Sequence, residues 1–231
     1  SWFYTTDGGA TWTENGNTEP GVAADCDLAG RLNLLGDGVI RGLGGFAELD
    51  PGTNTPGTSV RGSSMWVCGA GGHLWSSANG APPWQVSRAG TGSEIRAIVF
   101  DDSLTGWATP EHAVIQTTDG GKSWLRSGLR SSEAYRWGRG YFGLSRPGPS
   151  TLFVSYDLAE WYSDIFPFCF GPMRVYRTTD NGSTWDTVFA TAPLSYRGWG
   201  ASRTCFADAQ CGWHVGSLAG HNSVRTTDGG V

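Results

Sequence analysis

Charged residues are scarce in this chain. They make up 16% of its 231 residues, which is below the roughly 25% of an average globular domain. Lys and Arg number 16 against 21 Asp and Glu, so the formal net charge is -5. A chain with this balance has no bulk attraction for a polyanion, and we expect no nucleic-acid partner. No apolar run approaches the roughly 20 residues of a membrane-spanning helix.

The sequence also lacks long amphipathic helical patterns and the signatures of metal or nucleophilic catalysis. Its five cysteines contain no C-x-x-C pair, which argues against a zinc site. Its four histidines form no H-x-x-H or H-E-x-x-H pattern, and no G-x-S-x-G motif is present. We therefore expect neither a metal nor a cofactor.

Cys205 and Cys211 flank the stretch FADAQ, which is typical of a hairpin turn. Two antiparallel strands joined by such a turn can bring the cysteines face to face, within the geometry of a disulfide. A disulfide would favour an oxidising compartment. Two buried thiols are the alternative, and the sequence leaves both open.

Glycine and tryptophan are abundant instead, with 36 and 12 residues. Glycine-rich turns between aromatic-rich segments are typical of an all-β protein with many short strands.

A short phrase recurs along the chain. It reads YTTDGGATW (4–12), QTTDGGKSW (116–124), RTTDNGSTW (177–185) and RTTDGGV (225–231). We align a degraded copy, SSANGAPPW (76–84), with Ala78 at the Asp position and one extra residue before Trp84. The aspartate positions 7, 78, 119, 180 and 228 are then 71, 41, 61 and 48 residues apart. A period near 41 to 48, stretched by insertions, suits a unit of four short strands.

The segments beside the phrase repeat as well. Residues 95–124 line up with residues 202–230, so that Phe100 matches Phe206 and the Gly-Trp pair at 106–107 matches that at 212–213. Each unit follows the order strand, turn, strand, loop, strand, TDGG turn and a last strand that starts at the Trp. Several such meanders in sequence predict an all-β protein, a β-propeller of four-stranded antiparallel blades with about five units visible.

The residue types in the phrase suit a fastened turn. An Asp at the head of a tight turn accepts hydrogen bonds from backbone N–H groups further on, and Gly supplies the positive φ that follows. The Trp buries its ring between strands. We expect this structural role, rather than metal binding or catalysis, for Asp7, Asp119, Asp180, Asp228, Trp12, Trp124 and Trp185.

The phrase Ser/Thr-x-Asp-x-Gly-x-Thr-Trp resembles the Asp box of sialidases, xyloglucanases, sortilin-type receptors and the photosystem II assembly and stability factors. The longer pattern, with an aromatic-ended strand, an acidic turn, GW and TTDGGKSW, is most similar to the photosystem II stability-factor-like repeat family. The resemblance covers 95–127 and 197–231 well and 1–14, 65–88 and 174–190 in part. It does not extend to 15–62 or 147–172.

We expect one propeller domain over residues 1–231. Its parts are a partial first unit (1–14), an insertion (15–62), units at about 63–90, 91–130, 131–192 and 193–231, and a second insertion (156–173). A decayed blade around GVIRGLGGF (38–46) is the alternative for the first insertion. The outer units open at a third strand and stop at a turn, so we expect that the natural chain continues beyond both ends or was trimmed.

A glycosidase is the main enzymatic alternative, and it needs two carboxyl groups placed across the scissile bond. Candidates outside the turns are Asp25, Asp27, Glu48, Glu94, Glu111, Glu133, Asp157, Glu160 and Asp164. Stacking on sugar rings would fall to Trp137, Trp161 and Trp199. A sialidase-like site is disfavoured, because the early Arg-Ile-Pro that the resemblance would require is replaced by a mid-chain SRPGP (145–149).

Two features suggest a protein partner. The first is a set of arginines on comparable strands, which would form a basic patch for an anionic segment of a partner: Arg136, Arg139, Arg146, Arg197 and Arg203. The second is the apolar stretch IFPFCF, with Ile165, Phe166, Phe168 and Phe170 as candidate docking residues. Scattered solvated arginines and a strand packed in the core are the respective alternatives.

Our leading hypothesis is a non-enzymatic protein-interaction scaffold. The family resemblance implies a lumenal or periplasmic protein that holds a membrane-protein partner during assembly, or a peripheral subunit of a larger complex. A carbohydrate-active protein, either a glycosidase or a glycan-binding fragment, is the second hypothesis. An extracellular adhesin or receptor domain is the third.

Overall fold

A computed structural model of the chain describes most of the repeat region and parts of the N-terminal segment. The described residues are 2–4, 11, 13–15, 23–26, 32–36, 39–42, 45–48, 57–110, 113–130, 142–160, 169–190, 203–218 and 221–230.

The described chain is organised into six antiparallel sheets, and in each of them strands adjacent in sequence pair with one another. A two-stranded sheet holds β1 (Trp2–Tyr4) and β2 (Thr13–Asn15). Blade 1 holds β3 (Ala23–Cys26), β4 (Leu32–Gly36), β5 (Val39–Gly42) and β6 (Gly45–Glu48). Blade 2 holds β7 (Thr58–Arg61), β8 (Ser64–Cys68), β9 (His73–Ser77) and β10 (Gln85–Arg88), with a 3-10 turn, η1 (Ala70–Gly72), between β8 and β9.

Three further blades complete the described structure. Blade 3 holds β11 (Ile95–Phe100), β12 (Gly106–Pro110), β13 (Ala113–Thr117) and β14 (Leu125–Arg130). Blade 4 holds β15 (Phe142–Ser145), β16 (Leu152–Glu160), β17 (Cys169–Thr178) and β18 (Asp186–Ala190). Blade 5 holds β19 (Arg203–Phe206), β20 (Gly212–Leu218) and β21 (His221–Thr226).

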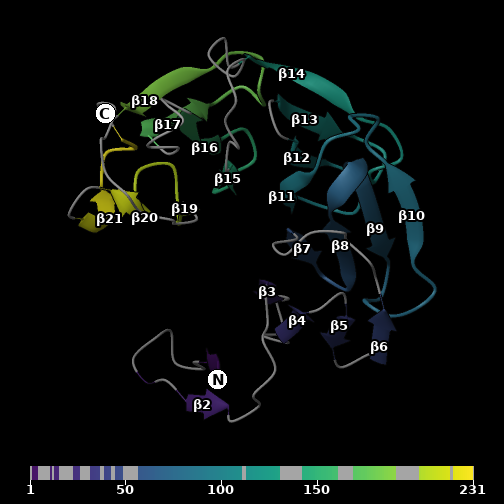
Figure 1. Ribbon diagram of the computed structural model, residues 1–231. Coiled ribbons are helices and arrows are strands. Elements are labelled where there is room, and N and C mark those ends of the chain that lie inside the picture. Colours follow the sequence, from purple (N-terminus) through teal and green to yellow (C-terminus); the bar gives the residue numbers. More distant parts are fainter. Residues whose placement is uncertain are drawn as a thin grey trace.

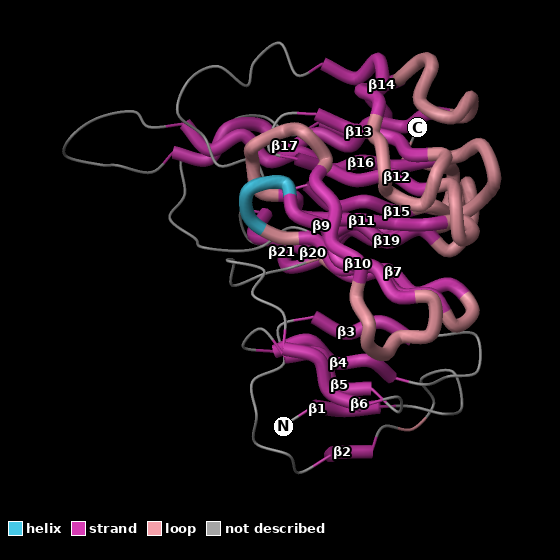
Figure 2. The backbone as a smooth tube through the Cα atoms, turned by 90° about the vertical axis from the view of Figure 1, so that its right-hand side faces the viewer, coloured by secondary structure: helices cyan, strands magenta, loops and turns pink. Residues whose placement is uncertain are grey.

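The blades follow one another around an arc, with the first strand of each blade innermost (Figure 1). Contacts between blades join consecutive first strands: β3 with β7, β7 with β11, β11 with β15 and β15 with β19. Seen from the side, the strands lie across the view and most of the described loops gather at one end of them (Figure 2). This is the β-propeller arrangement, so the predicted all-β fold of four-stranded antiparallel blades is confirmed.

The segment 15–62 is not the insertion that we preferred from the sequence. It contains blade 1, whose strands pair in the order β3-β4-β5-β6. The alternative of a blade around residues 38–46 is therefore the correct one, because β5 and β6 lie there. Its glycine-rich composition hid the strands, since several of these residues have no side chain with which to show a period of two.

The second predicted insertion, 156–173, is in part a pair of extended strands. The β16–β17 hairpin continues through it, with Asp157 opposite Met173 and Glu160 opposite Cys169. Residues 161–168 lie outside the described residues.

A stack of flat side chains joins each pair of blades from blade 2 to blade 5. Phe100, at the end of β11, lies parallel on Trp66 of blade 2 with ring centroids 3.9 Å apart. Phe206, at the end of β19, lies parallel on Phe153 of blade 4 at 3.5 Å. Such stacks bury large apolar surfaces and fix the angle between neighbouring sheets.

The Gly-Trp pairs of the sequence belong to these stacks. A methyl group placed on Gly106 would lie 2.7 Å from the ring of Phe100, so only glycine leaves room for the ring to lie flat on the neighbouring strand. The same holds for Gly212 under Phe206. Trp107, which follows Gly106, points to the opposite face of the sheet and packs against blade 4.

We expect Phe153→Ala to lower the free energy of unfolding by about 3–5 kcal/mol, because Phe153 is fully buried and its loss leaves a cavity under Phe206. Urea denaturation monitored by circular dichroism measures this change. Val86→Ala, at an exposed position on β10, is the matched control and should stay within about 0.5 kcal/mol of the wild type. Equal effects of the two substitutions would contradict the role of the stack.

Candidate functional site

The Asp-box turns are closed networks of hydrogen bonds. In blade 3 the Thr117 hydroxyl donates to Asp119 Oδ1 at 2.8 Å and accepts from the backbone N–H of Gly121 at 2.9 Å. Asp119 also accepts from the backbone N–H of Ser123 at 2.9 Å and from its hydroxyl at 2.5 Å. The ring N–H of Trp124 donates to the Gly121 carbonyl at 3.1 Å, which seats the indole against the turn.

The same network recurs in the next two blades. Asp180 accepts from the Thr178 hydroxyl at 2.7 Å and from the backbone N–H and the hydroxyl of Thr184 at 2.9 and 2.6 Å. Asp228 accepts from the Thr226 hydroxyl at 2.6 Å. In the turns of blades 3 and 4 both carboxylate oxygens serve the turn itself, as does Oδ1 of Asp228 in blade 5.

The aligned position of the degraded copy in blade 2 needs a correction. Ser77 Oγ donates to Asn79 Oδ1 at 2.9 Å, and the backbone N–H of Ala81 donates to the same oxygen at 3.0 Å. Asn79 therefore takes the place of the aspartate, and assigning that place to Ala78 was wrong. With Ser77 matched to Thr117, the turn has no extra residue before Trp84. The amide oxygen keeps the bond from the Ser77 hydroxyl, but the two bonds that Ser123 donates to Asp119 are missing, because Pro83 stands at that position and has neither an N–H nor a hydroxyl.

These hydrogen bonds hold the turn carboxylates in the ionised form. The Thr184 hydroxyl, with its backbone N–H and the Thr178 hydroxyl, lowers the pKa of Asp180 from 3.8 to about 2. The Ser123 hydroxyl and backbone N–H act in the same way and hold the pKa of Asp119 well below its usual range.

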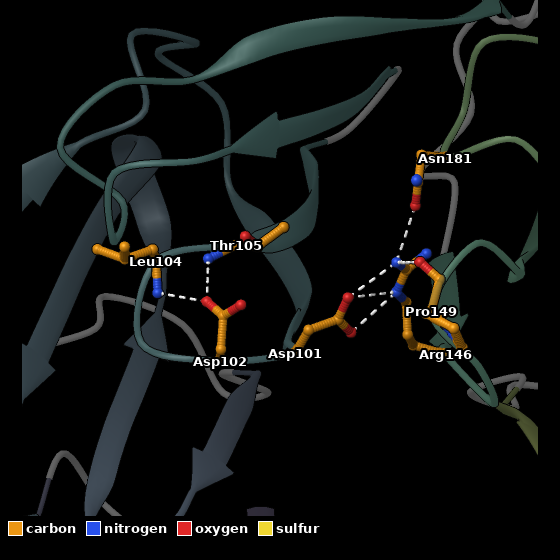
Figure 3. A network of polar contacts seen from close by, with 7 residues as sticks. All are labelled: Asp101, Asp102, Leu104, Thr105, Arg146, Pro149 and Asn181. Carbon is orange, nitrogen blue, oxygen red and sulfur yellow. Dashed lines mark hydrogen bonds and ion pairs between the residues drawn. The ribbon is translucent and has the colours of Figure 1, made fainter.

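A second kind of turn joins the first and second strands of blades 3 and 5. Asp102 accepts from the backbone N–H groups of Leu104 and Thr105, both at 2.7 Å (Figure 3). Asp208 repeats the arrangement in blade 5. The bonds lower the pKa of Asp102, chiefly through the Thr105 N–H, and that of Asp208, chiefly through the Cys211 N–H. The turn then docks on the Asp box of its own blade, as Gly120 N–H donates to the Leu104 carbonyl at 2.8 Å.

Arg146 lies in the core between blades 3 and 4, and not on a partner-binding surface. Its side chain is 3% exposed, and its guanidinium lies over the ring of Trp107 at 3.7 Å. It donates twice to Asp101 at 2.8 Å and once to Asn181 Oδ1 at 2.9 Å, and it also donates to the Pro149 carbonyl (Figure 3). The prediction that Arg146 binds a partner was wrong, because these contacts within the chain already occupy its charge.

Arg146 takes the place that phenylalanine has in the neighbouring blades. It directly follows β15, as Phe100 ends β11 and Phe206 ends β19. A planar guanidinium can stack on an aromatic ring as a phenyl ring does, and its charge is then balanced by Asp101.

The aromatic residues on which these flat groups lie, which we call platforms, occupy equivalent positions on the second strands of their blades. The set runs from blade 2 to blade 5. Trp66, Trp107 and Phe153 are 3%, 0% and 0% exposed, because the next blade covers each of them. The fourth member, Trp213 on β20, is 42% exposed.

The exposed platform lies in a short cross-strand row. Cys205 pairs with Trp213 across β19 and β20, and Trp213 pairs with Arg225 across β20 and β21. All three residues are exposed, and the Arg225 guanidinium lies 5.6 Å from the centre of the Trp213 ring. We call the surface formed by Cys205, Trp213 and Arg225 the open face.

A groove of about 320 Å³ lies between blade 5 and blade 4, and Trp213 and Arg225 of the open face are also among the residues that line it. Its apolar walls come from both blades, and its residues include Val188, Phe189, Phe206, Val224 and Gly230. His214 and Thr204 are also part of the lining. The open face and this groove are the two candidate binding features that the described residues bring together.

The repeated GW signal pointed to the position of Trp213, but its exposure depends on which neighbour covers it. Nothing in the sequence marked the groove.

Most other predicted site residues lie outside the described residues or have undescribed side chains. Outside lie Asp7, Trp12, Arg136, Arg139, Arg197, Ile165, Phe166, Phe168, Trp137, Trp161 and Trp199. Arg203 is in β19 and Phe170 is in β17, but the structure describes only their backbone. Among the nine candidate glycosidase carboxyl groups only the side chain of Glu94 is described, and it pairs with Arg96 at 2.9 Å.

Cys205 and Cys211 do not form the predicted disulfide. Both are free thiols, and the hairpin register pairs Cys205 with Trp213, leaving Cys211 in the turn. The alternative of two buried thiols is also wrong, because Cys205 is exposed and Cys211 is half-buried.

No protein-family model and no curated protein matches this chain, but solved structures do. An ancestral GH74 enzyme superposes with a TM-score of 0.62 at 17% identity, over 92% of this chain and 32% of that one. The GH74 xyloglucanase from Xanthomonas campestris gives 0.61 at 13%, over 87% and 36%. YCF48 from Cyanidioschyzon merolae gives 0.50 at 14%, over 98% and 88%.

The chain thus spans about a third of the length of the GH74 structures that it matches. At these identities the likeness shows the fold. The molecule has an Asp-box β-propeller fold, and both GH74 enzymes and YCF48 are among its structural neighbours.

We expect the contribution of Asp180 to stability to depend on pH. Its pKa is lower in the folded chain than the ordinary 3.8, so its ionised form stabilises the fold above about pH 4, and this stabilisation is lost as the pH falls toward about 2. In thermal melts, Asp180→Asn should melt below the wild type at pH 6, and the gap should close between about pH 4 and 2. A gap that stays constant over this range would contradict the assignment.

Replacement of Arg146 tests how much its contacts with Trp107 and Asp101 stabilise the boundary between blades 3 and 4. We expect Arg146→Ala to lower the free energy of unfolding by about 3–5 kcal/mol, because Asp101 loses its partner and Trp107 loses its cover. Arg146→Lys should recover only part of this, since an ammonium can neither lie flat on the ring nor bind both carboxylate oxygens in a fork. Arg88→Ala, at an exposed position on β10, is the control for urea denaturation and should have little effect. Full recovery by lysine would contradict the stacking role.

Proposed function

We propose that this chain is a non-enzymatic protein-interaction scaffold that holds a partner protein on its open face. The observation that carries this proposal is the 42% exposure of Trp213, at a position where the three equivalent aromatic residues are at most 3% exposed. An exposed tryptophan at a position built for stacking is a typical anchor of a protein interface.

The equivalent platforms indicate what the open face would bind. Trp66 and Phe153 each carry a phenyl ring, and Trp107 carries a guanidinium. The partner is therefore expected to present a flat side chain, Phe or Arg, to Trp213. A serine beside two of the buried platforms adds a polar contact, as Ser59 and Ser145 accept the backbone N–H of Phe100 and Phe206 at 3.0 and 2.8 Å. Cys205 has that position on the open face.

The family resemblance of the Asp-box repeats supports a more specific role. We propose that the chain acts like the photosystem II assembly and stability factors, as an assembly factor or peripheral subunit of a membrane-protein complex. A location in a thylakoid lumen, a periplasm or outside the cell agrees with that role. Among the residues that the structure describes, no helix has the length and apolarity needed to cross a membrane.

A glycoside hydrolase is the second candidate, favoured by the likeness of the fold to GH74 structures. A general acid on a glycosidase needs a raised pKa. The described carboxyl groups whose pKa is shifted all have it lowered by turn hydrogen bonds: Asp102, Asp119, Asp180 and Asp208. These four are turn residues and not candidates for that role, so we place the enzyme second on the family resemblance of the repeats, and an extracellular adhesin or receptor domain third.

The test is quantitative capture of the partner. Purified chain is cross-linked in an extract of the source organism, and the recovered proteins are measured by mass spectrometry. We expect Trp213→Ala to reduce recovery of the main partner at least tenfold and Arg225→Ala to reduce it less, because the indole supplies most of the buried area.

Val86→Ala removes another exposed apolar side chain and is the matched control, which should leave recovery unchanged. Two results would overturn the proposal. One is equal recovery with Trp213→Ala and the wild type, and the other is hydrolysis of xyloglucan by the purified chain.

A further inference from the structure

Two Asn-Gly pairs lie in equivalent Asp-box turns, one in blade 2 and one in blade 4. They are offset by one residue, because Asn79 stands at the aspartate position whereas Asn181 directly follows Asp180. Both asparagines are exposed. The backbone nitrogen of a residue after asparagine can attack the side-chain amide, and glycine has no side chain to obstruct the approach. The two turns therefore offer the same reaction two different environments.

The turn of blade 2 leaves the attacking nitrogen free. Among the described residues, none accepts a hydrogen bond from the Gly80 N–H. The Asn79 side chain is held beside it, because Oδ1 accepts the N–H of Ala81, the next residue, at 3.0 Å. A bond from the side chain to the second residue on encloses the Gly80 peptide and keeps the amide carbon near the Gly80 nitrogen. Donors on Oδ1 also stabilise the negative charge that develops there during attack.

The turn of blade 4 engages the corresponding groups. The Gly182 N–H is buried and donates to the Thr178 hydroxyl at 2.8 Å. The Asn181 amide oxygen accepts from the Arg146 guanidinium at 2.9 Å, so this side chain is directed away from its own turn (Figure 3). The next N–H, that of Ser183, donates to a backbone carbonyl instead of the amide. Attack by Gly182 must first break a buried hydrogen bond and turn the Asn181 side chain, which slows it.

We propose that Asn79 and Gly80, in the turn of blade 2, form a site of spontaneous deamidation. The Gly80 nitrogen loses its proton and bonds to the Asn79 amide carbon, and the amide nitrogen leaves as ammonia, so that a five-membered succinimide remains. Water then opens the ring at one of its two carbonyl groups. The products are aspartate, with the normal backbone, and isoaspartate, in which the chain runs through the former side chain. The reaction exchanges ammonia for water and needs no oxidant or reductant.

The two products affect the turn differently. Aspartate keeps Oδ1 and with it the bond from the Ala81 N–H, so the fold is retained. Its second oxygen gains no donor from Pro83, which has neither an N–H nor a hydroxyl. Isoaspartate adds one methylene group to the backbone and displaces the carboxylate, which disrupts the turn before β10. New and aged molecules therefore differ in charge and in the stability of blade 2. This modification does not depend on the proposed partner.

The test is incubation of the folded full chain at neutral pH, followed by tryptic digestion and mass spectrometry. Cleavage after arginine places Asn79 and Asn181 in separate peptides, residues 62–88 and 178–197. We expect Asn79 to deamidate about tenfold faster than Asn181 or more, because only the second site must break a buried hydrogen bond. Equal rates at the two sites, or no reaction at Asn79, would overturn the proposal.

A denatured sample shows whether the turn causes the difference. In guanidinium chloride both Asn-Gly pairs lose their turn contacts and should react at similar rates. A gap of the same size in the denatured chain would place its cause in the local sequence and overturn the proposal.

A variant separates the effects of the two products. Asn79→Asp has the aspartate product at this position and should melt at the same temperature as fresh wild type. Aged wild type that contains isoaspartate, as measured by isoaspartyl methyltransferase, should melt below both. A melting temperature of Asn79→Asp well below that of fresh wild type would contradict the retained turn bond.

Discussion

The stacking of one flat side chain on the aromatic platform of the preceding blade holds this propeller together. Blades of short strands have few other ways to fix their relative angle, since each contributes only a thin layer of side chains to the boundary. The upper group lies 3.5 to 3.9 Å from the centre of the platform ring whether it is Phe100, Phe206 or the guanidinium of Arg146. A shared requirement for planarity explains why an arginine can replace a phenylalanine in a core, provided that a carboxylate such as Asp101 balances it.

The polar turns support this arrangement rather than compete with it. In blades 3 and 4 the Asp box uses both oxygens of its own carboxylate within the turn, and the indole that follows lies against the turn by donating to a glycine carbonyl. The acidic residues that the sequence displays most prominently are therefore ionised turn caps. Under the proposed function, binding takes place where a repeated contact is left open, at the exposed Trp213 of blade 5.

Much of the fold could be predicted from the sequence because its signals are local. The TDGG phrase reports a turn, and the Phe and Gly-Trp spacing reports a hairpin, since these contacts form between residues close in the chain. Blade 1 was not predicted because its residues contain neither the TDGG phrase nor the Phe and Gly-Trp spacing. The sequence favours Ala78 over Asn79 as the counterpart of the aspartate because Ser76-Ser77 resembles Thr-Thr, whereas the hydroxyl of Ser77 fixes the register of the turn in the structure.

The sequence by itself determined the unit, its turn chemistry and the propeller architecture, all of which follow from short-range hydrogen bonds and a repeated pattern. Only the tertiary structure decided which of the equivalent residues are covered. Arg146 looked like a surface residue until blade 3 supplied Trp107 and Asp101, and Trp213 looked like another core residue until its exposure was seen. Burial between blades depends on partners far away in sequence, and no local pattern encodes it.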